Sequence, residues 1–498
     1  MPKSKSFRDA ERSAAAAIVV EGGTTAEDRP DYKCASYVEA EKKRKIIRDV
    51  YGGTDRLREC GKTYLPQWEG EDYDTDYKDR LAGAILFDAL SHTVGGLVGM
   101  VTRKDPVLGD KVPKKLEEYA WNIDNAGRPL SVFAKDIFTD AMLDGISFIH
   151  VDKPPVPTGV KWKSHVPPGL RPYWIDVKAH DLVNWNWEIV QGAPSLTLAV
   201  YRETVSVEKG RFGQKTITRY RELRPGYYVV WEEQVHGNDV LSFVPIEEGE
   251  VSLPYIPLFP CYTNRTGYME ADPLLMGLAH QNLRHYRVDS EHDHARSIAS
   301  TPMAFFKGCE VEDAMKFGAH YALLGKEEWS DAKWIETTGS SLNQTRTDLK
   351  DIEARMAFLG MSLLIAQPSP QPGGEGPTAT GDLIRKSEGD ATLMGAAKGL
   401  EMCLQNALDA TAEFEGEAGG GGTVTVNTDF HAQMMSPQMA AFWSGEVDKG
   451  HMSLETFWTI MQKGEQLSED FNPEAELDKL DEPDDDYVTE RGEEDEEV

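Results

Sequence analysis

Four of the twelve histidines lie within one short stretch of the chain. This cluster is the strongest candidate in the sequence for a metal-binding site. Neutral imidazole is a common zinc ligand, so a metal site has to be considered. However, His292 and His294 are two residues apart and would point to different faces of a helix, and no H-E-x-x-H pair exists. We therefore predict no metal site among the histidines of this stretch, which are His280, His285, His292 and His294.

Motifs for other kinds of catalysis are not found. The sequence has no G-x-x-x-x-G-K-[ST] phosphate loop, and the runs "GGEG" and "GGGG" lack the strand-turn-helix setting of nucleotide-binding loops. Asp, Glu and His are plentiful, but no combination has a spacing that forces a catalytic arrangement. We expect neither catalytic residues nor a cofactor.

The cysteines do not form a motif either. They are scattered, with no C-x-x-C pair and no metal-binding spacing. This pattern is typical of reduced core or surface thiols in a cytosolic protein. The five are Cys34, Cys60, Cys261, Cys309 and Cys403.

Composition limits the class of protein further. A chain of 498 residues that is 40% hydrophobic can build about two to four domains with cores. Its net charge of −31 argues against broad basic surfaces that grip nucleic acid, although DNA held at a distance is compatible with it. No apolar run approaches the roughly 18 residues of a membrane span, and the N-terminal stretch has no convincing cleavage site. We expect a cytoplasmic protein with no membrane contact.

Hydrophobic periodicity predicts helices in the first third of the chain, over residues 37–60, 76–101 and 130–144, with Gly145 as a stop. We interpret their apolar residues as core faces rather than sites. They are Val38, Ile46, Ile47, Val50 and Leu57, then Leu81, Ile85, Leu90, Val94, Leu97 and Val101, then Val132, Phe133, Ile137, Met142 and Leu143.

From about Phe148 to Tyr262 the period changes to two, which predicts antiparallel strands separated by Pro and Gly. Trp185 and Trp187 could form a stacking platform for bases. Residues two apart on a strand share one face of a sheet, so we favour sheet packing for this pair.

Beyond the strands, two long helices flank a small module. Asp272 as N-cap and Pro273 at the first helical position predict the start of the first helix, which could run roughly 40 Å and is polar along its second half. The second helix, over 342–366, keeps three-four spacing through Leu349, Ile352, Met356, Leu359 and Leu363. Helices with one modest apolar stripe suit a wall between protein neighbours and water.

A loop and further helices complete the chain. The stretch "AQPSPQPGGEGPTATGD" interrupts two helices with prolines and glycines and carries little charge. A helical pair follows near residue 436, with Ser436 and Ser453 as predicted caps, and the end is an acidic tail. The predicted fold class is α+β.

This order of elements resembles the portal protein of tailed bacteriophages, the head-to-tail connector. More narrowly, the chain resembles a portal-like group of unknown-function proteins through "LVGMVTRKDP", "GISFIHVDKPP", "YRVDSEHDHARSIASTPMAFFKG" and "TATGDLIRKSEGDATLMGAAKGLEMCLQNAL". The resemblance covers roughly Tyr37 to Gln466 and rests on the order of these phrases.

The resemblance implies a domain division. An N-terminal arm (1–32) and an acidic tail (469–498) have no counterpart in it. Between them it implies a wing (33–271), a stem helix (272–300), a clip (301–341), a second stem helix (342–366), a tunnel loop (367–381), a long kinked helix with a wing return (382–435) and a crown (436–468).

The resemblance also implies a function. A ring of identical subunits, twelve in the virion, would sit at one capsid vertex and conduct double-stranded DNA during packaging and ejection. Its partners would be the large terminase subunit, a tail adaptor, and capsid and scaffolding proteins. The protein would assemble in the host cytoplasm. Another head-tail adaptor or morphogenesis protein is the near alternative, and an uncharacterised hydrolase is the distant one.

Residue roles follow from this division. A polar, nearly neutral loop would touch passing DNA weakly, whereas a plain solvated linker is the alternative. The loop candidates are Gln367, Ser369, Gln371, Thr378 and Thr380. Candidates for basic rings in the stem lumen are Arg287, Arg296, Arg346, Lys350 and Arg355. Candidates for motor or adaptor contact on the clip are Lys307, Lys316, Lys326, Glu327 and Glu328.

Overall fold

The structure is a computed structural model, and the residues that it describes fall into several ranges. They are 18–19, 25–154, 170–236, 240–299, 303–307, 331–335, 340–361, 379–430, 437–463, 467, 471–473 and 476. The described chain forms two compact units, the first ending at Thr428 and the second beginning at Asp429. Helices and strands are mixed, which confirms the α+β class.

The N-terminal third of the first unit is helical, as predicted. Its helices are η1 (Ala26–Asp28), α2 (Ala35–Tyr51), α3 (Gly53–Cys60), η2 (Gly61–Thr63), η3 (Tyr73–Tyr77), α4 (Lys78–Gly83), α5 (Ala89–Val101), α6 (Lys114–Ala120) and α7 (Leu130–Asp144). Helix α7 ends as predicted, because Gly145 has a left-handed φ of 83°.

Three residues predicted to face the core are exposed instead. Val38 and Val132 are each 44% exposed, since the buried faces of α2 and α7 include the adjacent residues Tyr37 and Phe133 instead. Ile85 is 63% exposed because the predicted helix 76–101 is interrupted between α4 and α5, so no helical face carries it.

The strands are antiparallel, as predicted, and form two main sheets. The larger sheet has the order β1 (Ile18–Val19), β9 (Val240–Glu250), β8 (Tyr227–His236), β7 (Gly213–Arg224), β6 (Ala193–Lys209) and β5 (Leu182–Val190). The smaller sheet has the order β10 (Leu258–Tyr262), β3 (Ile146–Asp152) and β4 (Tyr173–Lys178). Short pairs join β11 (Arg265–Gly267) to β12 (Glu270–Ala271), and β15 (Val424–Thr425) to β2 (Val107–Leu108).

The sheets share a hydrophobic core that includes Phe148, Tyr201, Phe243 and Leu258. Trp185 belongs to this core at 7% exposure. Trp187 is 45% exposed and meets the ring of Tyr268 edge-on, with centroids 5.3 Å apart. Trp185 therefore packs in the sheet core, as predicted, whereas Trp187 lies outside that core, just past the register shift between Asn186 and Trp187.

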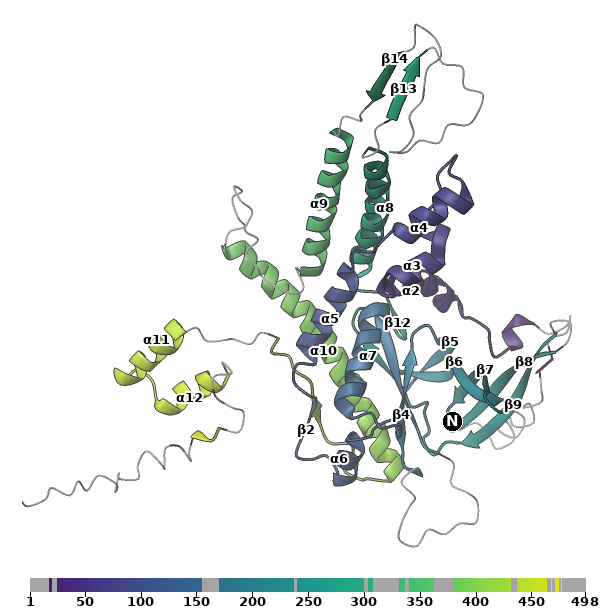
Figure 1. The fold of residues 1–498 in the computed structure, drawn as a ribbon. Helices are drawn as coiled ribbons and strands as arrows, with labels where there is room; N and C mark the ends of the chain where they lie inside the picture. The colour runs from purple at the N-terminus through teal and green to yellow at the C-terminus, as the bar shows by residue number, and fades with distance from the viewer. Residues whose placement is uncertain are drawn as a thin grey trace, which may run out of the picture. The chain divides into compact units, whose positions relative to one another are not determined.

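Two long helices and a hairpin follow the sheets. Helix α8 (Met276–Ala299) and helix α9 (Ser340–Met361) lie side by side, and β13 (Met303–Lys307) pairs antiparallel with β14 (Asp331–Ile335) at their far ends (Figure 1). Helix α10 (Ala379–Glu415) then returns across the smaller sheet and packs on β10 and β3. The predicted succession of helix, small module, helix and long helix is therefore present.

The predicted start of the first long helix is wrong. Helix α8 begins at Met276, four residues after Asp272, which does not cap it. The Asp272 carboxylate accepts a hydrogen bond from Lys43 at 2.8 Å, and its backbone N–H donates to the Asn264 carbonyl at 3.2 Å. A Cβ at Gly145 would lie 2.3 Å from the Asp272 carbonyl oxygen, so the end of α7 also holds this residue outside the helix.

The second unit contains α11 (Pro437–Asp448) and α12 (Leu454–Lys463), the helical pair predicted for the crown. The hydroxyl of Ser453 accepts a hydrogen bond from the Thr456 N–H at 3.2 Å, which confirms this predicted cap. Ser436 lies outside the described residues. The ring of Phe471 packs against Trp458 with centroids 5.5 Å apart, so the packed unit extends past the predicted boundary at residue 468.

Candidate nucleic-acid interface

The candidate interface is the wall formed by α8 and α9. On α9 the side chains of Leu349, Ile352 and Met356 are buried, and on α8 those of Leu278 and Tyr286. These residues keep the three-four spacing that gives each helix one apolar stripe. Most of the remaining circumference of α9 is exposed in the protomer, as expected for a helix with water or a neighbouring chain around it.

A glycine lets α9 approach the rest of the protein at its C-terminal end. A Cβ at Gly360 would lie 2.6 Å from the Thr93 hydroxyl oxygen on α5 and 3.4 Å from a methyl carbon of Leu278 on α8. The three helices therefore meet at this glycine. The junction fixes where the helix pair leaves α5.

The side chain of Asn282 on α8 hydrogen-bonds to the backbone where the chain between α4 and α5 enters α5. Its Oδ1 accepts from the Leu90 N–H at 3.1 Å, and its Nδ2 donates to the Phe87 carbonyl at 2.6 Å. The residue is fully buried, and its amide satisfies backbone groups at the start of α5. Sequence periodicity missed this residue, because a lone Asn in a polar helix carries no distinguishing signal.

The polar half of α8 is anchored to the N-terminal helices. Arg287 donates from Nε to the Tyr64 carbonyl at 2.7 Å. The ring of His294 meets Trp68 edge-on at 5.0 Å, and the guanidinium of Arg80 lies 3.9 Å from the centre of the same Trp68 ring. Arg287, a candidate for the stem lumen, thus serves contact within the protomer.

The other four candidates for the stem lumen lie on two helices and on different faces of them. Arg296 pairs with Asp293 at 3.1 Å on α8. Arg346, Lys350 and Arg355 are exposed on α9, and no ion pair engages them among the described residues. Arg346 and Lys350 are four residues apart and share a face, whereas Arg355 lies about half a turn away from Arg346. A single direction can therefore receive at most part of this set.

Most candidates on the clip and tunnel loop cannot be placed. Lys307 is the last residue of β13, and Thr380 lies in the first turn of α10, so the predicted loop ends by residue 378. The others lie outside the described residues. They are Lys316, Lys326, Glu327 and Glu328 on the clip, and Gln367, Ser369, Gln371 and Thr378 in the loop.

Helix α8 also carries a group of buried polar atoms. No hydrogen-bond partner within the described protomer reaches Gln281 Oε1, His285 Nδ1, Tyr286 Oη, Ser290 Oγ or His292 Nδ1. The other ring nitrogen of His285 lies 3.4 Å from Glu353 on α9. Buried polar atoms are nearly always hydrogen-bonded in folded proteins, so we expect bound water at these five atoms.

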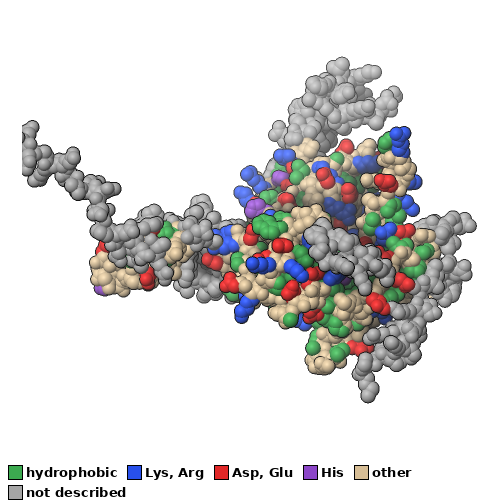
Figure 2. Space-filling model, turned by 90° about the horizontal axis from the view of Figure 1, so that it is seen from below, with side chains coloured by type: hydrophobic (Ala, Val, Ile, Leu, Met, Phe, Trp, Pro, Cys, Tyr) green, Lys and Arg blue, Asp and Glu red, His purple; other side chains and the backbone are tan. Residues whose placement is uncertain are grey.

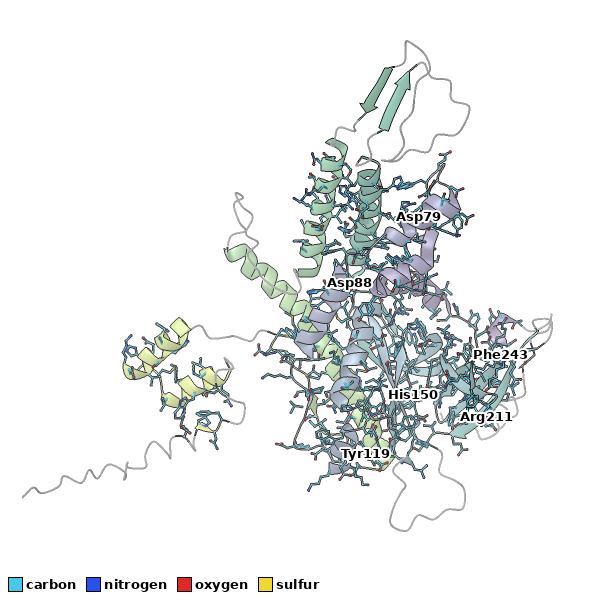
Figure 3. All side chains as sticks on the ribbon, in the orientation of Figure 1. Asp79, Asp88, Tyr119, His150, Arg211 and Phe243 are labelled. Carbon is cyan, nitrogen blue, oxygen red and sulfur yellow. The ribbon has the colours of Figure 1, made fainter. Side chains whose placement is uncertain are left out.

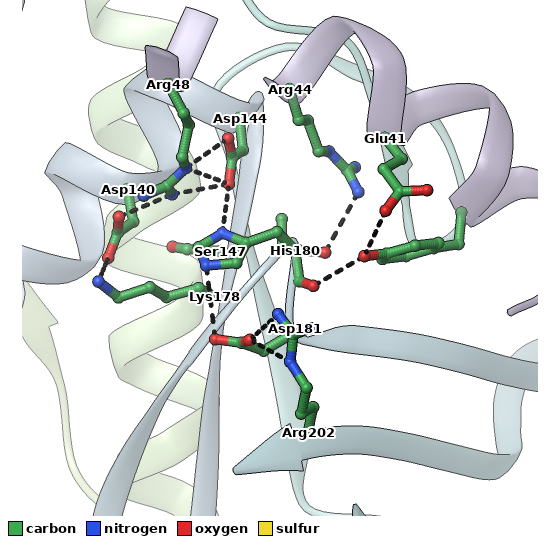
Figure 4. A network of polar contacts seen from close by, with 12 residues as sticks. Glu41, Arg44, Arg48, Asp140, Asp144, Ser147, Lys178, His180, Asp181 and Arg202 are labelled. Carbon is green, nitrogen blue, oxygen red and sulfur yellow. Dashed lines mark hydrogen bonds and ion pairs between the residues drawn. The ribbon is translucent and has the colours of Figure 1, made fainter. Parts of the chain in front are cut away.

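A charged network joins α2, α7 and the smaller sheet (Figure 4). Arg48 donates from Nε to Asp144 at 2.9 Å and from Nη2 to Asp140 at 2.7 Å, while Lys178 and His180 approach these carboxylates at 3.8 Å. Burial alone would raise the pKa of Asp144, but His180 and Arg48 hold it below its ordinary value. The network therefore ties α2, α7 and the end of β4 together around an ionised carboxylate.

No group of three or more His, Cys, Asp or Glu is placed to hold a metal ion within the described ranges. Across the same residues, no helix is both long and apolar enough to cross a membrane. Four of the five cysteines are placed and all four are free, with Cys261 and Cys403 buried.

Charge is mixed on the surface of the protein. On the face drawn in Figure 2, Lys and Arg are interspersed with Asp and Glu, and no broad basic area is visible. This agrees with the net charge of −31.

A groove of about 770 Å³ lies between α10 and the strands. Its walls are mainly apolar and include Tyr255, Phe259, Tyr262, Tyr268 and Met402. The sequence offered no signal for this groove, since its residues come from three separate stretches, 194–196, 255–268 and 395–406.

Comparisons with known proteins give one family match. A family model described as a domain of unknown function, DUF4055, matches residues 273–415. This range begins just before α8 and ends with α10. No curated protein matches the chain.

Three solved structures of gene transfer agent (GTA) particles are among those to which the chain is similar. The virion of the native particle gives a TM-score of 0.38 at 10% identity, over 73% of this chain and 87% of that chain. The neck of the empty particle, computed with C6 symmetry, gives 0.39 at 12%, over 74% and 86%. The neck of the native particle, computed with C12 symmetry, gives 0.36 at 11%, over 75% and 89%.

Proposed function

We propose that this protein is a portal protein, which forms a ring at one capsid vertex and conducts double-stranded DNA during packaging and ejection. The observation that carries the proposal is the succession of α8, the β13–β14 hairpin, α9 and α10. Two long helices with the hairpin at their far ends form a projecting stem, and the following helix returns to the body of the protomer (Figure 1).

The stem supports a ring because its surface is incomplete in one protomer. Helix α9 has one buried apolar stripe, and most of its remaining side chains are exposed. Head-to-tail packing around an axis gives each helix pair a neighbour on both sides, and such packing closes into a ring when the rotation closes. A dodecamer is the ring that we propose.

The charge of the chain suits DNA that must slide. Duplex DNA carries one charge per about 1.7 Å, so a ring dense in arginine would bind it tightly and retain it. A chain with net charge −31 avoids this, while either Arg346 and Lys350 or Arg355 on the other side of α9 would supply one or two cations per subunit. We expect weak DNA binding by the isolated ring at physiological salt, with a shallow salt dependence. Fluorescence anisotropy over a salt series measures both, and tight binding with a steep slope would contradict the weak-contact model.

The proposed partners follow from the ends of the stem. The clip would meet the large terminase subunit during packaging and a tail adaptor afterwards, and the wing would meet capsid and scaffolding proteins. The protein would act in the virion after assembly in the host cytoplasm. With no phosphate loop of its own in the sequence, it would depend on a separate ATPase to move DNA.

The assembly state tests the proposal. Mass photometry of the purified full chain should give a dominant species near twelve times 55.5 kDa. A species that stays at the mass of one chain over the accessible concentrations would refute a ring-forming portal.

A further inference from the structure

An exposed tryptophan stands at the end of α6. Trp121 is 81% exposed, and among the described residues only Phe212 is a more exposed large hydrophobic side chain. Its neighbours one turn back, Glu117 and Glu118, are also exposed, and no ion pair engages either of them in the described chain. An exposed tryptophan beside carboxylates that form no ion pair is typical of a protein–protein interface rather than of a surface that stays in contact with solvent.

The groove beside α10 is complementary to Trp121 and its two glutamates in shape, polarity and charge. It is concave and mainly apolar, with Tyr262, Tyr268 and Met402 on its walls, and Met402 is 66% exposed. Arg265 lies at the groove with its guanidinium 4.9 Å from the centre of the Tyr262 ring, and no carboxylate pairs with it among the residues described. The other cation, Lys398, is held by Glu401 at 2.6 Å.

These two features lie on opposite sides of α10. The groove residues Lys398, Met402 and Asn406 follow each other at four-residue spacing on one face of the helix. Glu415, whose carboxylate lies 3.8 Å from Lys115 of α6, comes nine residues after Asn406 and so points the opposite way. The side chain of Tyr119 marks α6 in Figure 3.

We propose that Trp121 of one copy of this chain inserts into the groove beside α10 of the next copy, with Glu117 and Glu118 facing Arg265. This inference rests on the proposed ring. A head-to-tail contact needs two different, complementary surfaces on separate sides of the protomer, and the tryptophan and the groove provide them. Opposite charges beside the apolar contact set the direction of packing.

Substitution of the tryptophan tests the contact. The Trp121→Ala variant should raise the protein concentration at which rings half-dissociate by at least about tenfold, because interface tryptophans in apolar pockets carry much of the binding energy. Phe212→Ala is the matched control and should leave the midpoint unchanged. Phe212 is 89% exposed at the turn after β6, at the opposite end of that strand from the groove residues 194–196. Thermal unfolding of the dissociated chains should be the same for both variants and the unaltered protein.

A charge swap tests the orientation. Glu118→Arg and Arg265→Glu should each weaken the ring, and the double variant should recover most of the loss, which a merely destabilised fold would not do. Rings whose midpoint is unchanged in Trp121→Ala, or a double variant no better than the singles, would overturn this inference and leave the proposed ring intact. An unaltered protein that forms no ring would overturn both proposals.

Discussion

His150 is buried at the centre of β3, where its Nδ1 lies 2.9 Å from the Tyr201 hydroxyl (Figure 3). Burial, helped by the nearby Arg221 charge, lowers the pKa of His150 from 6.5 to about 4. The folded protein therefore keeps this imidazole neutral at pH values where the unfolded chain would protonate it.

The first prediction concerns the acid stability of this residue. Because the pKa is lower in the folded state, the contribution of a neutral His150 is fully present above pH 6.5 and is lost as the pH falls toward 4. Between pH 7 and pH 5 the free energy of unfolding should fall by about 2 kcal/mol through this group. In His150→Gln that part of the fall should disappear, as urea unfolding at the two pH values would measure.

A control histidine makes the result specific. His280→Gln changes an exposed residue on α8 and should keep the full pH dependence of the unaltered protein. Equal pH dependence in His150→Gln and the unaltered protein would mean that the buried imidazole does not carry this effect.

At the scale of elements, the position of α10 depends on one glycine. A Cβ at Gly399 would lie 1.9 Å from the Tyr262 carbonyl oxygen, so the helix approaches β10 more closely than any side chain allows. Gly395 lies one turn earlier on the same helix, and a Cβ added there would have no atom within 4 Å.

The second prediction compares these two positions. Gly399→Ala should destabilise the first unit by at least about 2 kcal/mol, because the clash is with backbone rather than with a side chain that can rotate. Gly395→Ala should stabilise it by up to about 1 kcal/mol, since alanine is the better helix former. Thermal unfolding of both variants measures the difference, and similar midpoints would show that α10 can shift away from β10.

Periodicity predicted the elements whose stability comes from one continuous apolar stripe. Helix α7, helix α9 and the antiparallel strands are of this kind. The predicted helix 76–101 failed because Asn282, distant in sequence, satisfies the backbone at Leu90 and Phe87 and thereby stabilises a break. Such a contact exists only after folding.

The candidate site was less predictable for the same reason. In the sequence, Arg287 and Arg355 look alike, since each is an arginine on a long polar helix. In the structure, only Arg287 donates a hydrogen bond to the Tyr64 carbonyl. The charged network could have been suspected, since Asp140 and Asp144 are four residues apart on α7 and share a face. The groove beside α10 could not, because its walls come from β6, β10, β11 and α10.

At the scale of the whole molecule, the third prediction concerns the acidic end of the chain. Removal of residues 477–498 should leave ring assembly and the thermal stability of the second unit unchanged, since it spares the contact of Phe471 with Trp458. Removal of 470–498 also deletes Phe471 and should lower the unfolding temperature of that unit. Calorimetry and mass photometry of both truncations separate these outcomes, and loss of rings on the shorter truncation would show that the tail takes part in assembly.

The central claim is that copies of this chain close into a ring around a channel. Electron cryo-microscopy of the purified full-length protein tests it most directly, because end-on views show rotational symmetry and a central hole together. We predict twelvefold end-on views with an open axial channel and a narrower projecting stem in side views. Compact particles without an axial hole, or single chains only, would contradict the claim.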